Sequence, residues 1–175
     1  MLRNLILVGF MGTGKTSAGR RAAERLGFAY VDTDDLIEAR AGKPISRIFA
    51  EEGEGHFRDL EADVLRSLAA REGHVVATGG GCVLREANWD ALRRAGRVVC
   101  LTARPEVIFE RVRRETHRPL LATPDPMARI VELLERRAPF YARADRTIDT
   151  SDLSVEEVAD RLVELWEEAR KESEC

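Results

Sequence analysis

Cysteine and histidine are scarce in this chain of 175 residues, which contains three of each. Cys82, Cys100 and Cys175 lie far apart in the sequence and form no CxxC pair, so the patterns of a disulfide framework and of a zinc site are both missing. A chain without these features is typical of a reducing compartment. We therefore predict a cytoplasmic protein.

Long apolar runs are also missing, since none approaches the ~18 residues that a membrane-spanning helix needs. The segment MLRNLILVGF enters a glycine-rich loop without a small-residue cleavage site, so we expect no signal peptide and no membrane partner. A net charge of -3 disfavours nonspecific binding to nucleic acid. With 44% apolar and 34% charged residues, the chain is expected to form one globular domain over residues 1–175.

Five short apolar runs predict β-strands. They are nearly continuous rather than alternating, which is typical of strands buried on both faces of a parallel sheet. The expected strands are Leu5–Val8, Phe28–Val31, Val75–Thr78, Val98–Leu101 and Arg146–Ile148.

Helical patterns separate these runs, and most of them begin at a recognisable signal. The expected helices are Thr16–Leu26, Leu60–Ala70, one that begins near Pro105, one that follows the cap Asp125-Pro126, and one that opens with the capping box Ser154–Glu157. Strands that alternate with helices predict an α/β fold, a five-stranded parallel sheet flanked by helices. Residues 33–61 and 112–126 are less regular, and we expect them to be a substrate-binding excursion and a lid.

The segment GFMGTGKT, residues 9–16, matches the phosphate-loop pattern G-x-x-x-x-G-K-[ST]. It follows a predicted strand and opens a predicted helix, so its backbone N–H groups and the helix N-terminus can bind phosphate. Lys15 is expected to reach the terminal phosphates of ATP, and Thr16 to offer its hydroxyl to Mg²⁺. The predicted nucleotide-binding residues of the loop are Gly12, Thr13, Gly14, Lys15, Thr16 and Ser17. The chain has no Asn-Lys-x-Asp element, which disfavours a GTPase.

Three carboxylates, Asp32, Asp34 and Asp35, follow the second predicted strand in the segment VDTDDLI. In open α/β sheets, ligands bind beyond the carboxyl ends of the strands. Two carboxylates at that edge can divide the work: one orients Mg²⁺ through water, and the other accepts the proton of an acceptor hydroxyl. The alternative is a solvated turn with a helix-capping aspartate.

A second group of residues indicates a pocket for a small, ring-like carboxylate. Arg58 and Arg137 offer fork-shaped guanidinium groups, and Phe49 and Phe57 offer aromatic surface. The alternatives are that the arginines are solvated and that both rings belong to the core. Three consecutive glycines, residues 79–81, follow the third predicted strand and leave the backbone bare, either for a ligand or for a tight turn.

Together these motifs resemble those of the shikimate kinases, a family of P-loop kinases related in fold to nucleoside monophosphate kinases. The shared segments, in the order of that family, are GFMGTGKT, DTDDLIE, IF…HFR…E, TGGG, RPLL, RRAPFY and DTS. The resemblance implies a monomer that uses ATP and Mg²⁺ to phosphorylate the 3-hydroxyl of shikimate, yielding shikimate 3-phosphate and ADP in the chorismate pathway of aromatic amino-acid biosynthesis. A kinase of another hydroxy acid such as gluconate, and a noncatalytic nucleotide-binding switch, are the alternatives.

The resemblance also implies roles for individual residues. Asp34 would bind the acceptor hydroxyls and act as the catalytic base. Asp32 would contact Mg²⁺ indirectly, through water. Lys15 and Arg118, the latter on the lid, would stabilise the transferring phosphoryl group. The residues implied to bind shikimate are Asp34, Arg58, Gly79, Gly80, Gly81 and Arg137.

At the adenine end, the resemblance implies a contact from Arg111, for which Arg113 is an alternative. Ser151 lies in the DTS segment that would form the other wall of the adenine site.

Overall fold

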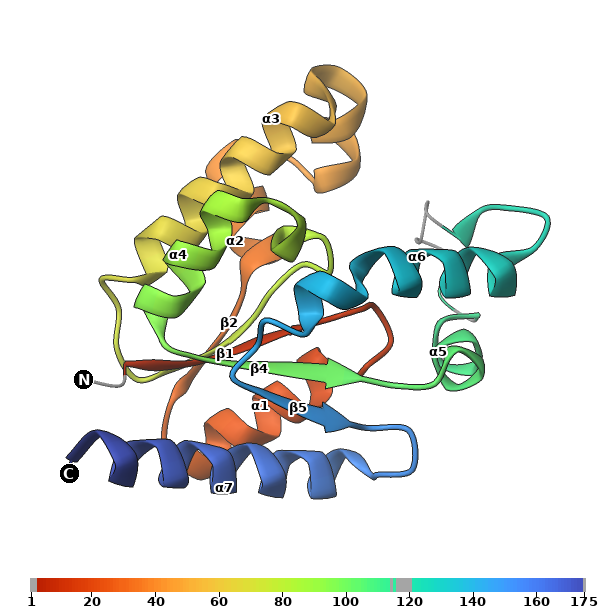
Figure 1. Ribbon diagram of the computed structural model, residues 1–175. Coiled ribbons are helices and arrows are strands. Elements are labelled where there is room, and N and C mark those ends of the chain that lie inside the picture. Colours follow the sequence, from red (N-terminus) through yellow and green to blue (C-terminus); the bar gives the residue numbers. More distant parts are fainter. Residues whose placement is uncertain (1–2, 114, 116–120, 175) are drawn as a thin grey trace.

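The computed structural model describes residues 3–113, 115 and 121–174 (Figure 1). Five parallel strands form one sheet in the order β2-β3-β1-β4-β5. The strands are β1 (Asn4–Gly9), β2 (Ala29–Asp32), β3 (His74–Ala77), β4 (Arg97–Thr102) and β5 (Arg146–Asp149). Each observed boundary lies within one residue of the predicted one, and the predicted five-stranded parallel sheet is confirmed.

The central strand β1 divides its side chains between two cores, because successive residues of a strand point to opposite faces. Leu5 and Leu7 join one buried cluster, and Ile6 and Val8 join the other. The expectation that all five strands are buried on both faces is wrong for the two edge strands. In β2 and β5 several residues are exposed or half-buried, since each edge strand has a neighbour on one side only.

Helices α1 (Lys15–Leu26) and α7 (Val155–Glu174) cover one face of the sheet (Figure 1). Small residues such as Ala18 and Ala22 on α1 allow it to lie close to the sheet. Trp166 of α7 packs edge-on against Phe28, with 5.1 Å between the ring centroids. This layer carries the helix that opens from the phosphate loop.

The other face is covered by the remaining helices, whose apolar residues share the second core cluster (Figure 1). They are α2 (Thr33–Ala41), α3 (Ile45–Leu68), α4 (Glu86–Ala95), α5 (Pro105–Val112) and α6 (Pro126–Tyr141), with a short 3-10 turn at Cys82–Leu84. Trp89 and Phe10 are among the largest side chains buried there. The indole N–H of Trp89 donates to the Val83 carbonyl at 2.9 Å, which fixes the segment after the three glycines.

Three helices differ from the predicted ones, and one of them, α2, lies in the excursion for which no helix boundaries were predicted. Helix α3 begins at Ile45 rather than near Leu60, and it contains a break at Gly53, whose φ of 84° only glycine adopts readily. Helix α4 was not predicted, and it begins at Glu86 without a side-chain cap. The capping predictions at Asp125 and at Ser154–Glu157 are confirmed by side-chain hydrogen bonds to the first backbone N–H groups.

A buried asparagine joins four segments at the amino end of the sheet. The amide of Asn4 donates to the carbonyls of Arg71 at 2.8 Å and Ala95 at 2.7 Å. Its oxygen accepts the backbone N–H of His74 at 3.1 Å. Asn4 therefore ties the start of β1 to the start of β3, to the segment after α3 and to the last residue of α4.

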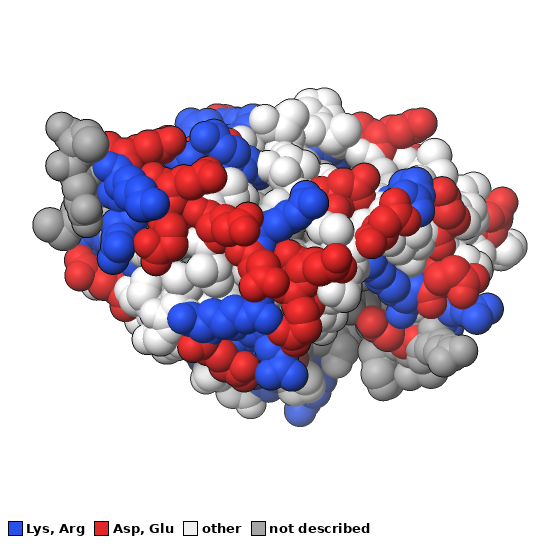
Figure 2. Space-filling view, turned by 90° about the horizontal axis from the view of Figure 1, so that it is seen from below, with Lys and Arg blue, Asp and Glu red and all other residues white. Residues whose placement is uncertain are grey.

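The surface of the α1–α7 layer carries both signs of charge side by side (Figure 2). Arg25 of α1 pairs with Glu156 and with Asp160 of α7, the latter at 2.6 Å, and Arg21 pairs with Glu156 at 3.1 Å. These ion pairs connect the two helices. In the part of the chain that the structure describes, no helix combines the length and the apolar character needed to cross a membrane.

Candidate active site

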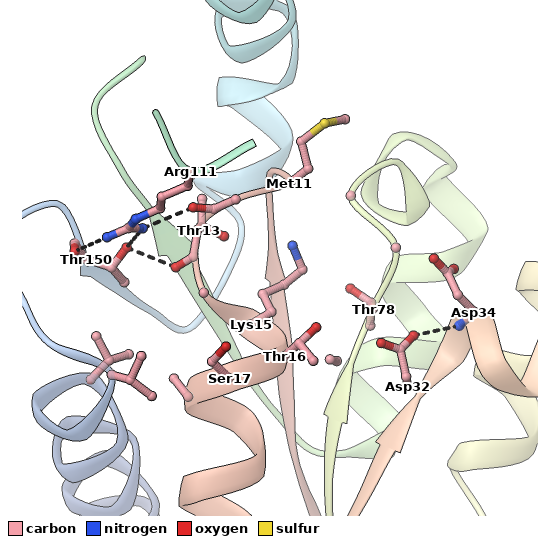
Figure 3. Close-up of a pocket in the computed structure, with 18 of the residues that line it drawn as sticks. Met11, Thr13, Lys15, Thr16, Ser17, Asp32, Asp34, Thr78, Arg111 and Thr150 are labelled. Carbon is pink, nitrogen blue, oxygen red and sulfur yellow. Dashed lines mark hydrogen bonds between the residues drawn. The ribbon is translucent and has the colours of Figure 1, made fainter. Parts of the chain in front are cut away.

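A cavity of about 470 Å³ lies at the carboxyl end of the sheet, between the phosphate loop, α2 and the loop before α7 (Figure 3). Its residues come from segments far apart in the sequence. They are Met11–Ala18, Asp32, Asp34, Ala77–Gly80, Arg111, Glu115, Thr150, Leu153, Val155 and Val158. The structure thus brings the predicted nucleotide loop and the predicted acidic edge into one cavity.

The phosphate loop is shaped by glycines in the left-handed region. Gly12 has a φ of 73° and Gly14 a φ of 96°, conformations that other residues rarely adopt. Gly14 caps α1 without a side-chain hydrogen bond, so the first N–H groups of the helix remain for a ligand. The Lys15 ammonium donates to the carbonyls of Gly9 at 2.6 Å and Phe10 at 2.9 Å, which holds it inside the loop.

Arg111 of α5 joins the phosphate loop to the loop before α7. One terminal nitrogen donates to the Gly12 carbonyl and to the Thr150 hydroxyl, both at 3.0 Å, and the other donates to the Thr150 carbonyl at 2.9 Å. The Thr150 hydroxyl in turn donates to the Thr13 carbonyl at 2.9 Å. Arg111 therefore lines the cavity in a fixed position, whereas its alternative Arg113 pairs with Glu110 outside it.

Ser151 is not among the residues that line the cavity. Its hydroxyl donates to Asp149 at 2.6 Å and accepts the backbone N–H of Arg104 at 2.9 Å. Its neighbours Thr150 and Leu153 line the cavity instead. Arg118 lies outside the described residues, as do the other residues of 116–120 and residue 114 of the predicted lid.

The acidic edge begins with Asp32, the last residue of β2 and the N-cap of α2. Its carboxylate accepts the Asp34 backbone N–H at 2.9 Å, as the capping interpretation predicted (Figure 3). Burial raises the pKa of Asp32, and the positive charge of Lys15 opposes that shift. Asp32 and Asp34 both line the cavity, so Asp32 caps α2 and faces the cavity at the same time.

The donors in the cavity fit a magnesium ion. Thr16 and Asp32 both line it, and Mg²⁺ is usually held by one or two protein oxygens together with water and substrate phosphates. Among the described residues, no three or more His, Cys, Asp or Glu side chains gather in one cluster that could hold a metal ion.

The three consecutive glycines each face a different charged side chain. A Cβ on Gly79 would lie 3.2 Å from Asp34 Oδ1 and equally close to an oxygen of Glu61. A Cβ on Gly80 would lie 3.3 Å from a terminal nitrogen of Arg137, and one on Gly81 would lie 2.6 Å from Arg58 Nη2. The bare backbone of this segment therefore lies where the predicted base and both predicted arginines converge.

Two residues without a predicted role hold this group together. Glu61 is buried and its Oε2 accepts Arg58 Nη1 at 3.0 Å, while the Tyr141 hydroxyl donates to the Gly80 carbonyl at 2.8 Å. Burial raises the pKa of Glu61, and Arg58 opposes that shift; burial also raises the pKa of Tyr141 to about 12, opposed by Arg137.

A signal for each of these two residues was present in the sequence. Glu61 follows Arg58 by three residues and Tyr141 follows Arg137 by four, spacings that place both pairs on one helix face.

The two phenylalanines form a tilted ring pair rather than an aromatic wall around the cavity. Their ring centroids are 4.8 Å apart, and neither lines the cavity. Phe57 is 6% exposed and belongs to the core, with the Arg58 guanidinium 5.1 Å from its ring centroid, whereas Phe49 is 41% exposed. Phe57 thus supports Arg58 from below, and Phe49 covers Phe57.

Comparisons with known proteins agree with this geometry. The family model described as shikimate kinase matches residues 11–167. A shikimate kinase of Thermodesulfovibrio yellowstonii is 46% identical over 166 residues, which cover 95% of this chain and 96% of that protein. A shikimate kinase of Geobacter metallireducens is 50% identical over 157 residues, covering 90% of this chain and 88% of that protein.

Solved structures give the same result. The structure of a shikimate kinase from Acinetobacter baumannii in complex with shikimate matches with a TM-score of 0.90 at 38% identity, covering 97% of this chain and 95% of that one. A gluconokinase from Sinorhizobium meliloti matches with a TM-score of 0.58 at 22% identity, a likeness of fold alone. The full-length match of sequence and structure shows that the chain belongs to the shikimate kinase family.

Proposed function

We propose that this protein transfers the γ-phosphoryl group of ATP to the 3-hydroxyl of shikimate, forming shikimate 3-phosphate and ADP. The observation that carries the proposal is the convergence of Asp34, Arg58 and Arg137 on the glycine segment 79–81, at the end of the cavity that begins with the phosphate loop. Membership of the shikimate kinase family and the shikimate complex of the Acinetobacter baumannii relative support the choice of acceptor.

On the nucleotide side, we assign the triphosphate to the backbone N–H groups of residues 12–17 at the start of α1. Lys15, held by two loop carbonyls, supplies a positive charge toward the β- and γ-phosphates. Thr16 and Asp32 would hold Mg²⁺, which neutralises charge on the phosphates when it is bound. Arg111 and the apolar residues Leu153 and Val155, which line the cavity, would form the walls of the adenine site.

On the acceptor side, Asp34 orients the hydroxyl and accepts its proton as the new O–P bond forms. Arg58 and Arg137 pair with the shikimate carboxylate, because guanidinium forks match a carboxylate with two parallel hydrogen bonds. Gly79, Gly80 and Gly81 leave room for the ring, since a side chain there would enter the space between these charged groups. Residues 33–61, which form α2 and most of α3, thus supply the base and one arginine.

Arg118 and the lid over residues 112–126 stay a prediction from the resemblance. A positive side chain that reaches the transferring phosphoryl group stabilises its negative charge in the transition state.

A coupled ADP-release assay with ATP and Mg²⁺ tests the proposal, with shikimate and gluconate as alternative acceptors. We expect turnover with shikimate and none with gluconate. Turnover with gluconate alone would overturn the acceptor assignment. No ADP release with either acid would favour the noncatalytic switch.

A further inference from the structure

Tyr30 on β2 has a buried hydroxyl that finds no hydrogen-bond partner among the described residues. Buried polar groups nearly always have a partner, so an exception calls for an explanation. The ring lies between the edge of the sheet and α1, beside the nucleotide end of the site. The following inference rests on the proposed ATP- and Mg²⁺-dependent reaction.

The ring occupies a slot that α1 leaves open for it. Gly19 lies in the interior of α1, a position where glycine destabilises a helix relative to alanine. A Cβ at Gly19 would lie 3.1 Å from the Tyr30 ring and 3.0 Å from Leu7, which explains the glycine by close packing. On the other side, the Arg20 guanidinium lies 4.4 Å from the centroid of the Tyr30 ring.

The slot directs the hydroxyl toward Thr16. Thr16 and Gly19 are three residues apart on α1 and so share a face of the helix. A ring that lies across Gly19 therefore extends its hydroxyl toward the preceding turn. Tyr30 and Asp32 are two residues apart on β2, so their side chains point to the same face of the sheet, the face that α1 covers.

We propose that Tyr30 is a positioning residue for the magnesium end of the site. Its oxygen accepts a hydrogen bond from the Thr16 hydroxyl, and its own hydroxyl donates a hydrogen bond to the Asp32 carboxylate. A threonine hydroxyl can offer a lone pair to a cation only if its proton points away from that cation. Tyr30 provides the acceptor for that proton. Its donation to Asp32 fixes the direction of the chain of hydrogen bonds, because the carboxylate only accepts.

The proposal predicts an effect that depends on the metal. Without Mg²⁺ there is no cation for the lone pair of the Thr16 hydroxyl to bind. The loss of Tyr30 Oη should therefore leave nucleotide binding unchanged. With Mg²⁺ present, the same loss should weaken nucleotide binding. A role in packing alone would respond equally in both conditions.

The test is Tyr30→Phe, which keeps the ring in the slot and removes only the hydroxyl. We would measure the dissociation constant of ADP by titration calorimetry in Mg²⁺ and in EDTA. The dissociation constant in EDTA divided by that in Mg²⁺ should fall by about threefold to tenfold, the contribution of one hydrogen bond. The dissociation constant in EDTA should stay the same. An unchanged ratio, or an equal loss in both conditions, would overturn the proposal.

Ser67→Ala is the control, because it removes one side-chain hydroxyl, hydrogen-bonded to the Val64 carbonyl on α3, that does not line the cavity. It should leave the Mg²⁺-dependent gain in ADP affinity as in the wild type. Because ADP binding needs no shikimate, this result is independent of the acceptor assignment. Wild-type protein that failed to phosphorylate shikimate would refute the proposed function, and a normal Mg²⁺ gain in Tyr30→Phe would refute the role of Tyr30.

Discussion

Gly81→Ala should separate acceptor binding from nucleotide binding. The backbone of Gly81 has a φ of -95° and a ψ of -2°, which alanine adopts without strain. The added methyl group would lie 2.6 Å from Arg58 Nη2 and 2.9 Å from Nη1. Ordinary contact between nonbonded heavy atoms begins near ~3.5 Å, so the guanidinium must retreat by roughly 1 Å.

A retreat of that size removes the alignment on which a bidentate pair depends. A hydrogen bond to a charged group contributes about 1.5–3 kcal/mol, and each 1.4 kcal/mol corresponds to about a tenfold change in binding. We therefore expect KM for shikimate to rise by roughly 10- to 100-fold in the coupled ADP-release assay. The affinity for ADP should be unchanged, because the phosphate loop is untouched.

Gly55→Ala is the matched control for this prediction. An added methyl group at Gly55, within α3, would find no heavy atom within 4 Å. It should leave both substrates unaffected and stabilise the helix by about 0.5–1 kcal/mol. If Gly81→Ala bound shikimate as tightly as Gly55→Ala does, Arg58 would not bind the acceptor, and that half of the proposed site would be wrong.

Three further changes probe other parts of the molecule. Asp34→Asn should lower turnover by at least ~100-fold while ADP affinity, measured by calorimetry, stays near that of the wild type, and near-normal turnover would exclude Asp34 as the base. Asn4→Ala should lower the free energy of unfolding by roughly 3 kcal/mol in urea titrations, since it leaves buried carbonyls without donors; a loss below ~1 kcal/mol would contradict its joining role. Burial raises the folded pKa of Glu61 above its ordinary value of 4.5. Any stability that depends on its protonated form is therefore lost as the pH rises from 4.5 through the raised folded pKa. The wild type should therefore lose stability relative to Glu61→Gln between pH 4.5 and neutral pH, and a constant difference between their urea midpoints would refute the shift.

The strands and the nucleotide loop could be predicted from the sequence because their signals are local. The continuous apolar runs located all five strands to within a residue, and the glycine pattern located the loop. Helices were found where a proline or a capping side chain marked their start, as at Pro105 and Asp125. Helix α4 was missed because Arg85 caps it without a side-chain hydrogen bond.

The acceptor end could not be assembled from local signals. Asp34, Arg58, Gly80 and Arg137 come from α2, α3, the segment after β3 and α6, so their proximity is set by sheet order and helix packing. The resemblance to shikimate kinases connected them before the structure did. The aromatic pair shows the limit of composition as a guide, since Phe57 packs in the core beneath Arg58 rather than beside the cavity.

The division of the molecule by its sheet has a practical consequence for redesign. The phosphate loop leads into α1 in one layer, whereas the proposed base and the proposed acceptor-binding arginines are carried by α2, α3 and α6 in the other. A protein engineer can therefore exchange side chains on α2, α3 and α6 to accommodate a different hydroxy acid while leaving the helix that receives the triphosphate as it is. Acceptor selection and ATP binding would then be separable parts of the proposed enzyme.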